Sequence, residues 1–155
     1  MLCIALLHYP VYNKKGEIVT TAIANMDVHD IARVAKTYGV QKFYIVNPIE
    51  EQSNLAFEII THWREGYGAN FNKHRHAAFE LIAVKEDLQC VIADILEQSG
   101  FLPKLIVTGA NFSGDVLKFS QLKEMLQSTQ VPYLIIFGTG SGMFQAVSTC
   151  EPSTA

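Results

Sequence analysis

The chain alternates short continuous apolar runs with longer segments in which apolar residues recur every three or four positions. Continuous apolar runs predict strands that are buried on both faces. They lie at residues 2–7, 42–46, 104–110 and 132–138, and a further run over 77–84 ends in a short strand. This alternation predicts one α/β domain with a mostly parallel sheet of about five strands, flanked by helices.

The helical segments are expected between these strands. The first begins with Asp27 as N-cap and Asp30 in a capping box, and it ends at Gly39. Others are expected over 49–65, over 85–98 and from Ser120 onward. Their predicted buried faces are Ile31, Val34, Ala35 and Tyr38; Leu55, Ile59 and Trp63; Leu88, Val91, Ile92, Ile95 and Leu96; and Leu122, Met125 and Leu126. The sequence "NKKG" at 13–16 predicts a turn.

Composition supports a globular domain that spans residues 1–155. The chain is 49% hydrophobic and 17% charged, which excludes a disordered chain. Its net charge of −3 gives no overall attraction to nucleic acid, so any RNA contact must depend on a local basic patch.

Cysteine usage and the first residues bear on location. Cys3, Cys90 and Cys150 are an odd number without metal-binding spacing, which favours buried thiols in a reducing compartment. The first ten residues lack a basic region and contain His8 and Pro10, so we expect no signal peptide. No stretch has membrane-spanning length. We expect a cytoplasmic protein.

The most unusual segment is "LIIFGTGSGM" at 134–143, an apolar strand that continues into three glycines at alternate positions. The spacing fits neither the G-x-G-x-x-G dinucleotide motif, nor the phosphate-binding loop that needs a lysine, nor the G-x-S-x-G serine elbow. Glycine permits positive φ and close approach of the backbone to another group. The loop is therefore either a binding site that holds a small molecule against the backbone, or an ordinary glycine-rich connection between a strand and a helix.

In parallel sheets, ligands bind at the carboxyl ends of the strands. Residues 47–48, 108–110 and 138–142 each follow a predicted strand. We expect these three segments along one edge of the sheet.

Two further segments contain candidate binding residues. Arg33, near the edge of a buried helical stripe, can offer its planar guanidinium to a phosphate or carboxylate, or it can pair with Asp30 on the helix surface. His29 stands beside acidic residues without the spacing of a metal site, and we expect no metal.

Residues 62–76, "HWREGYGANFNKHRH", interleave basic and aromatic side chains, as suits contact with unpaired bases and phosphates. The alternative is a core Trp63 followed by a solvated loop. The candidate RNA-binding residues are Arg64, Lys73 and Arg75, with Lys14 and Lys15 as a possible extension of the patch.

Residues 27–40 and 134–143 together resemble the SPOUT class of S-adenosylmethionine-dependent RNA methyltransferases, a knotted α/β family. Arg33, Tyr38 and Gly39 match the first motif of that class, whereas Asp27 stands where asparagine is usual. The glycine-rich segment is similar to the second motif. Residues 8–40 closely resemble a small bacterial branch of uncharacterised members, and the resemblance covers most of residues 1–147.

The resemblance implies a cofactor, a substrate and an assembly. S-adenosylmethionine would lie bent against backbone amides of two loops, at Thr108, Gly109 and Ala110 and at Phe137, Gly138, Thr139, Gly140 and Gly142. Arg33 would position the target nucleotide of a tRNA or rRNA. Members of the class form a trefoil knot and are usually homodimers.

The resemblance also implies a third cofactor loop followed by a C-terminal helix. Only residues 151–152 are similar to this part of the family pattern, at the start of the third motif. Against that pattern the chain looks truncated, and we expect weak cofactor binding. Two alternatives therefore stay open. One is an inactive remnant that acts at most as an RNA-binding module, and the other is a flavodoxin-like nucleotide-binding interaction domain.

Overall fold

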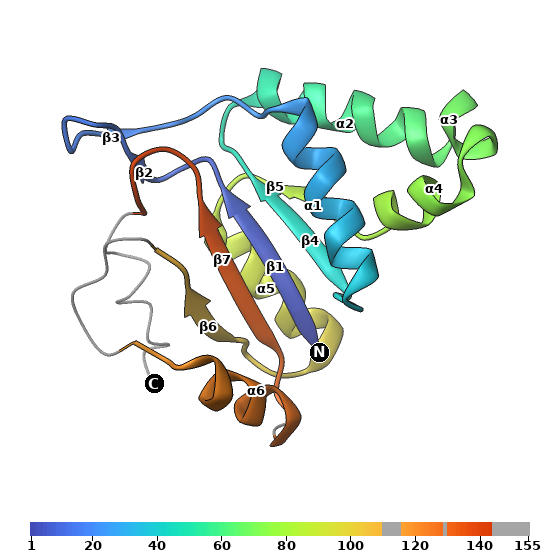
Figure 1. Cartoon of the computed structure of the whole chain (residues 1–155). Coiled ribbons are helices and arrows are strands. Elements are labelled where there is room, and N and C mark those ends of the chain that lie inside the picture. Colours follow the sequence, from blue (N-terminus) through green and yellow to red (C-terminus); the bar gives the residue numbers. More distant parts are fainter. Residues whose placement is uncertain (110–115, 129, 144–155) are drawn as a thin grey trace.

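The computed structural model describes residues 1–109, 116–128 and 130–143. Five parallel strands form one sheet in the order β5-β4-β1-β7-β6 (Figure 1). The strands are β1 (Leu2–Leu7), β4 (Lys42–Val46), β5 (Ile82–Lys85), β6 (Lys104–Val107) and β7 (Tyr133–Gly138). This arrangement confirms the predicted α/β fold with its five-stranded parallel sheet. The knot region was expected to be incomplete, and residues 151–152, the expected start of the third cofactor loop, lie outside the described residues.

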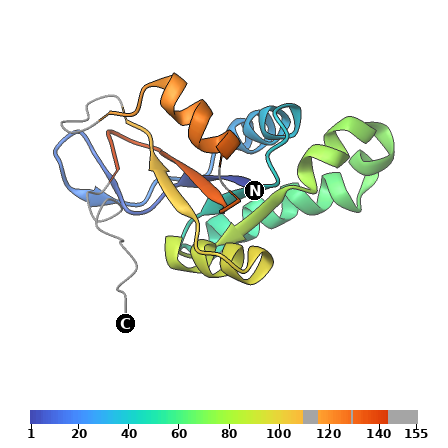
Figure 2. The same cartoon turned by 90° about the horizontal axis from the view of Figure 1, so that it is seen from below.

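Helices cover the two faces of the sheet. They are α1 (Asn25–Thr37), α2 (Glu50–Arg64), α3 (Tyr67–Phe71), α4 (Lys73–Phe79), α5 (Leu88–Ser99) and α6 (Phe119–Ser128). Figure 2 shows the sheet between α1 and α5. None of the helices in the described part of the chain is long and apolar enough to cross a membrane.

Alternation along the central strand divides the core into two layers. Ile4 and Leu6 of β1 pack in the cluster that includes Ala32 of α1. Ala5 and Leu7 point to the other face and pack in the cluster that includes Val91 of α5. Because successive side chains of a strand alternate between faces, the continuous apolar run of β1 serves both layers.

A two-stranded antiparallel hairpin, β2 (Val11–Tyr12) and β3 (Ile18–Val19), lies beside the carboxyl end of the sheet (Figure 1). The predicted turn at its tip is confirmed. The Asn13 side-chain oxygen accepts hydrogen bonds from the N–H groups of Lys15 and Glu17, at 2.8 and 3.0 Å. Gly16 has φ +76°, which a side chain would strain.

Three predicted helix starts were wrong. Helix α5 begins at Leu88 with Asp87 as N-cap rather than at residue 85, because Lys85 is the last residue of β5. Helix α1 begins at Asn25 with Ala24 as N-cap, because the Ala24 carbonyl already accepts from the N–H groups of Asp27 and Val28. Asp27 therefore lies in the first turn, where its negative charge interacts favourably with the positive end of the helix dipole. Helix α6 begins at Phe119, so Ser120 lies inside it.

The predicted helix faces were correct only in part. In α1 the buried residues are Val28, Ala32 and Ala35, whereas Val34 and Tyr38 are exposed. In α2 the buried line runs through Ala56 and Ile60, and the expected stripe residue Leu55 is 41% exposed. In α5 the expectation holds for Leu88, Val91 and Ile95, but Leu96 is exposed. Small alanines, rather than the larger apolar residues, allow α1 and α2 to approach the sheet closely.

Candidate functional site

The loops after β6 and β7 meet at the carboxyl edge of the sheet. Val107, the last residue of β6, pairs with Ile136 of β7, and Gly138 pairs with Leu7 of β1. The Thr108 N–H and hydroxyl both donate to the Ile136 carbonyl, at 3.1 and 2.9 Å. The structure therefore brings together the two predicted cofactor loops as far as Gly109, while Ala110 lies outside the described residues.

The glycine loop packs against the β2–β3 hairpin. The Ser141 N–H donates to the Tyr12 carbonyl at 2.8 Å, and the Tyr12 N–H donates to the Gly142 carbonyl at 3.0 Å. Gly140 has φ +74°, and a Cβ added to it would lie 2.8 Å from the Tyr12 carbonyl oxygen. Only glycine fits at this position without movement of one backbone segment.

Two other glycines of these loops border open space, whereas a Cβ added at Gly138 would clash with the Met143 side chain. A Cβ added at Gly109 or Gly142 would meet no heavy atom of the described residues within 4 Å. The N–H groups of Gly140 and Gly142 make no hydrogen bond to another described residue. The loop therefore leaves both backbone donors and room beside the chain for a ligand.

Thr139 joins this loop to a buried polar chain. Its hydroxyl donates to the Leu7 carbonyl at 3.0 Å and also contacts the Thr21 hydroxyl. The Thr21 hydroxyl lies 3.0 Å from Nδ1 of His8, which follows directly after β1. When each hydroxyl donates toward Leu7, His8 donates from Nδ1, so its Nε2 is the unprotonated nitrogen.

His8 and Asn47 are the two fully buried polar residues among the described positions. Asn47 donates to the Thr21 carbonyl at 3.2 Å and accepts from the Ile49 N–H at 3.0 Å. The Nε2 atom of His8 is buried without a hydrogen-bond partner among the described residues. Burial lowers the pKa of His8 below 6.5, with Asp27 and the Ala22 backbone acting in the opposite direction, so the ring is neutral near pH 7.

Sequence reasoning did not identify His8 and Thr21 as part of the site. The available signal was position, because His8 directly follows a strand that is apolar throughout, at the edge where ligands of parallel sheets bind. Thr21 lies in the irregular segment before α1, and its connection with Thr139 is visible only in three dimensions.

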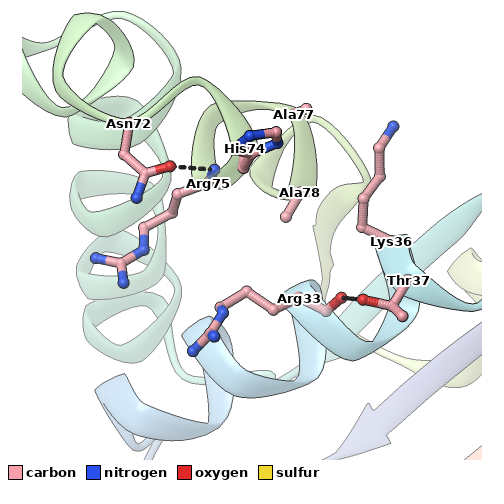
Figure 3. A pocket seen from close by; sticks show the side chains of 8 residues that line it. All are labelled: Arg33, Lys36, Thr37, Asn72, His74, Arg75, Ala77 and Ala78. Carbon is pink, nitrogen blue, oxygen red and sulfur yellow. Dashed lines mark hydrogen bonds between the residues drawn. The ribbon is translucent and has the colours of Figure 1, made fainter.

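Arg33 lies elsewhere, on the exposed side of α1. Its guanidinium is 3.6 Å from the Asp30 carboxylate, and both side chains are more than half exposed, at 61% and 63%. This is the surface pair that the sequence allowed as one interpretation. Arg33 lines a recess between α1 and α4 that contains no residue of the glycine loop (Figure 3). Within this chain, the structure does not bring Arg33 and the glycine loop together.

The segment 62–76 is helical rather than a loop, and it forms the end of α2 with α3 and α4. Trp63 is half-buried, and the Arg75 guanidinium lies over its ring at 4.5 Å from the centroid. The rings of His29 and His62 meet Trp63 edge-on. Beside them is a second recess of about 380 Å³. Trp63 is thus partly in the core, as the alternative interpretation of this segment predicted, and the Arg75 guanidinium is stacked on its ring.

The other predicted RNA-binding residues are separated in space. Lys14 and Lys15 are exposed at the hairpin, and Lys73 is exposed at the start of α4, at the opposite end of the molecule (Figure 1). Arg64 is engaged within the fold, because its guanidinium donates to three backbone carbonyls, those of Phe79, Glu80 and Ile82. These residues do not form one continuous patch.

From the sequence, no metal site is expected at His29 and its acidic neighbours, and the structure allows this expectation to be compared with the positions of potential metal ligands. In the described part of the chain, the only group of potential metal ligands that lie close together is Glu86, Asp87 and Cys90 at the start of α5. His29 is not a member of this group. The Asp87 side chain accepts from the Cys90 N–H at 2.7 Å and so caps the helix. The cluster therefore has a structural explanation.

Comparison with known proteins identifies the family of the fold. Residues 1–152 match the family described as SAM-dependent RNA methyltransferase. An uncharacterized protein of Aquifex aeolicus is 39% identical over 140 residues, which cover 90% of this chain and 68% of that protein. The tRNA (guanine-N(1)-)-methyltransferases of Oleidesulfovibrio alaskensis and Nitratidesulfovibrio vulgaris are 37% and 36% identical over 139 residues. The match covers 90% of this chain but only 32% of each of those two enzymes.

Proposed function

The chain belongs to the SAM-dependent RNA methyltransferase family, and from that premise we propose that it is a SPOUT-type enzyme that methylates a nucleotide of tRNA or rRNA in the cytoplasm. S-adenosylmethionine binds on the loops after β6 and β7. The chain spans about a third of the two named tRNA methyltransferases that it matches, so their activity is a proposal for this chain. Their names make a guanine of tRNA the first substrate to test.

The meeting of two glycine-containing loops at the carboxyl edge is the observation that carries this proposal. Gly109 and Gly142 border open space, and the N–H groups of Gly140 and Gly142 have no partner among the described residues. Such donors suit the adenine nitrogens and the carboxylate of the cofactor. The residues present therefore fit the cofactor, although the wall that the resemblance assigns to residues 151–152 lies outside the described part.

Bound S-adenosylmethionine would supply a methyl group on a positively charged sulfur, with S-adenosylhomocysteine as the leaving group and the proton of the RNA acceptor atom passing to solvent. The task of the chain is alignment, which can supply about 7–11 kcal/mol of a barrier when the geometry is close to that of the transition state. Thr108 and Thr139 serve this task by holding their loops against Ile136 and Leu7. Water exclusion at this edge comes from the buried hairpin residue Val11 and from Met143, which packs against the same cluster.

RNA contact is assigned to the exposed side chains of Lys14 and Lys15 on the hairpin and Lys73 on α4, together with the partly buried Arg75 of α4. Arg64 contributes to stability instead, since its guanidinium already serves three carbonyls. A homodimer, expected where the C-terminal region is complete, is part of the proposal. Its support is the exposure of Val116, Leu117 and Phe119, of which Phe119 is 91% exposed. Of the two alternatives from the sequence analysis, the inactive remnant is favoured over the flavodoxin-like domain, because the family match supports a methyltransferase lineage.

Calorimetric titration of the full chain with S-adenosylmethionine and with S-adenosylhomocysteine tests the proposal. We expect weak but measurable binding that Gly140→Val abolishes and Arg33→Ala retains. Transfer of labelled methyl groups to an unmodified tRNA transcript then tests catalysis, with nucleoside mass spectrometry to locate the product. A folded sample that binds no cofactor at millimolar concentration is the remnant, not the enzyme.

A further inference from the structure

The recess between α1 and α4 has a volume of about 350 Å³ and a basic lining (Figure 3). Of the eight residues around it, four are arginine, lysine or histidine, and none carries a carboxylate. Arg33 and Lys36 come from α1, and His74 and Arg75 come from α4. In a chain with a net charge of −3, this concentration of basic groups needs an explanation.

Arg75 is held in place before any ligand arrives. Its guanidinium lies over the Trp63 ring, 4.5 Å from the centroid. Its backbone N–H donates to the Asn72 side chain at 3.0 Å, which caps α4. The Nε atom of Arg75 is buried and has no hydrogen-bond partner among the described residues. A buried donor without a partner is costly, and a phosphate oxygen is the acceptor that a planar guanidinium fits best.

The Arg33 guanidinium lies on the same side of the recess as that of Arg75, whereas Lys36 lies on the other side and points away from Arg75 (Figure 3). Both side chains are free to respond. The Arg33–Asp30 pair is exposed to solvent, and such pairs contribute only about 0–1 kcal/mol. A phosphate can therefore recruit Arg33 at small cost. Lys36, one turn away on the same helix, is exposed as well.

The potential of this cluster acts on a neighbouring ring. The pKa of His29 is lowered first by burial and then by Arg75, Arg33 and His62, while Asp30 opposes them. Among the charged neighbours of this ring, Arg75 has the largest effect, ahead of the carboxylate of Asp30. Positive potential in a recess is the electrostatic condition for binding a phosphate.

We propose that the recess of Arg33, Lys36, His74 and Arg75 binds a backbone phosphate of the RNA substrate, at a site separate from the cofactor loops. This inference rests on the proposed function for its choice of RNA, since the family acts on RNA. An acidic protein segment offers carboxylates instead and is an outcome of the test. Bound RNA then extends from the α1–α4 surface toward the carboxyl edge, where α1 begins (Figure 1).

The experiment measures binding of the full chain to a fluorescent, unmodified tRNA transcript by anisotropy at several KCl concentrations. The double variant Arg33→Gln/Lys36→Gln removes two charges from the recess. Its matched control, Lys118→Gln/Lys123→Gln, removes two exposed lysines near and on α6. We expect the recess variant to bind about tenfold more weakly at ~0.1 M salt, with the salt slope reduced by about two phosphate contacts. We expect the control to change affinity by less than about twofold.

Cofactor titration of the same variants separates this inference from the proposed function. Equal losses for the recess variant and its control overturn the phosphate site, even when S-adenosylmethionine binds as proposed. A chain that binds no cofactor but loses RNA affinity only in the recess variant keeps the site and overturns the enzyme.

Two further probes test the ligand class. NMR of the arginine Nε–H groups follows Arg75 directly, and we expect its signal to shift with a short RNA hairpin. A shift of the same size with inorganic phosphate at equal ionic strength shows a small-anion site and overturns the RNA assignment. Competition by polyglutamate as effective as that by unlabelled RNA also overturns it.

Discussion

Thr139 makes two hydrogen bonds to the Leu7 carbonyl oxygen, because its side-chain hydroxyl and its backbone N–H both donate to that oxygen at 3.0 Å. The first residue of the loop after β7 is thereby fixed to the end of β1. We expect Thr139→Val, which keeps the side-chain shape, to lower the free energy of unfolding by about 1–3 kcal/mol, since it also removes the partner of Thr21. Urea denaturation measures this change.

Thr139→Ser is the matched control for that substitution. It keeps the hydroxyl, and we expect it to retain cofactor affinity that Thr139→Val loses. Equal cofactor affinity in the two variants would show that the hydroxyl has no part in holding the loop.

Gly140→Ala tests the contact between the glycine loop and the hairpin. Gly140 has φ +74° and Gly16 has φ +76°, but only at Gly140 would a Cβ meet backbone, at 2.8 Å from the Tyr12 oxygen. We expect Gly16→Ala to cost about 1–2 kcal/mol for its conformation alone. Gly140→Ala should cost more and should also weaken cofactor binding, as denaturation and calorimetry together can measure. Equal costs would mean that Tyr12 moves aside freely.

The pH dependence of stability tests the buried ring of His8. Its pKa is lowered from 6.5 in the folded chain, so the unfolded chain binds more protons between these two values. Stability is therefore expected to fall as pH drops from about 6.5 through the lowered pKa and to be level below it. Each unit of pKa difference corresponds to about 1.4 kcal/mol.

Unfolding by urea at about pH 7.5 and about pH 5 measures this dependence. The pKa of His29 is also lowered, so His8→Gln should reduce the dependence without removing it. NMR titration of the His8 ring gives the direct measurement. A folded-state pKa at or above 6.5 would contradict the expected cost of charging this ring.

Arg64→Lys separates structural from RNA-binding roles at one position. The Arg64 guanidinium reaches the carbonyls of Phe79, Glu80 and Ile82 at 3.0, 3.2 and 2.6 Å. An ammonium group keeps the charge but cannot span all three oxygens. We expect a loss of about 1.5–3 kcal/mol in the free energy of unfolding.

Arg33→Lys, at an exposed site, is the control for stability and should change it by less than about 0.5 kcal/mol. Unchanged stability in Arg64→Lys together with weaker RNA binding would instead restore Arg64 to the RNA-binding surface.

The strands were predictable because the signal is local. A strand buried on both faces, such as β1 or β7, must be apolar throughout, and few other structures need such a run. Helix boundaries and faces were harder. Ala24 caps α1 without a side-chain bond, so no cap signal precedes Asn25. The buried faces are set by how closely a helix approaches the sheet, which the alanines at 32 and 56 decide rather than the larger residues nearby.

The site was predictable only where it follows strands. Thr108 and Gly138 end neighbouring strands, so the rule for parallel sheets placed them together. Arg33 and Arg75 belong to different helices, and no sequence spacing relates them. The chain from His8 through Thr21 to Thr139 likewise joins three distant positions, and its partners become neighbours only because β1 pairs with β7.

That pairing has a consequence for synthesis of the chain. β1 is made before the other strands of the sheet, yet its neighbour β7 is made only after all of them. Until then, β1 can pair with β4 alone, and its other edge offers unsatisfied N–H and C=O groups along an apolar strand. The nascent chain therefore exposes an aggregation-prone edge until β7 has been made, and contacts between such distant segments slow the final folding step.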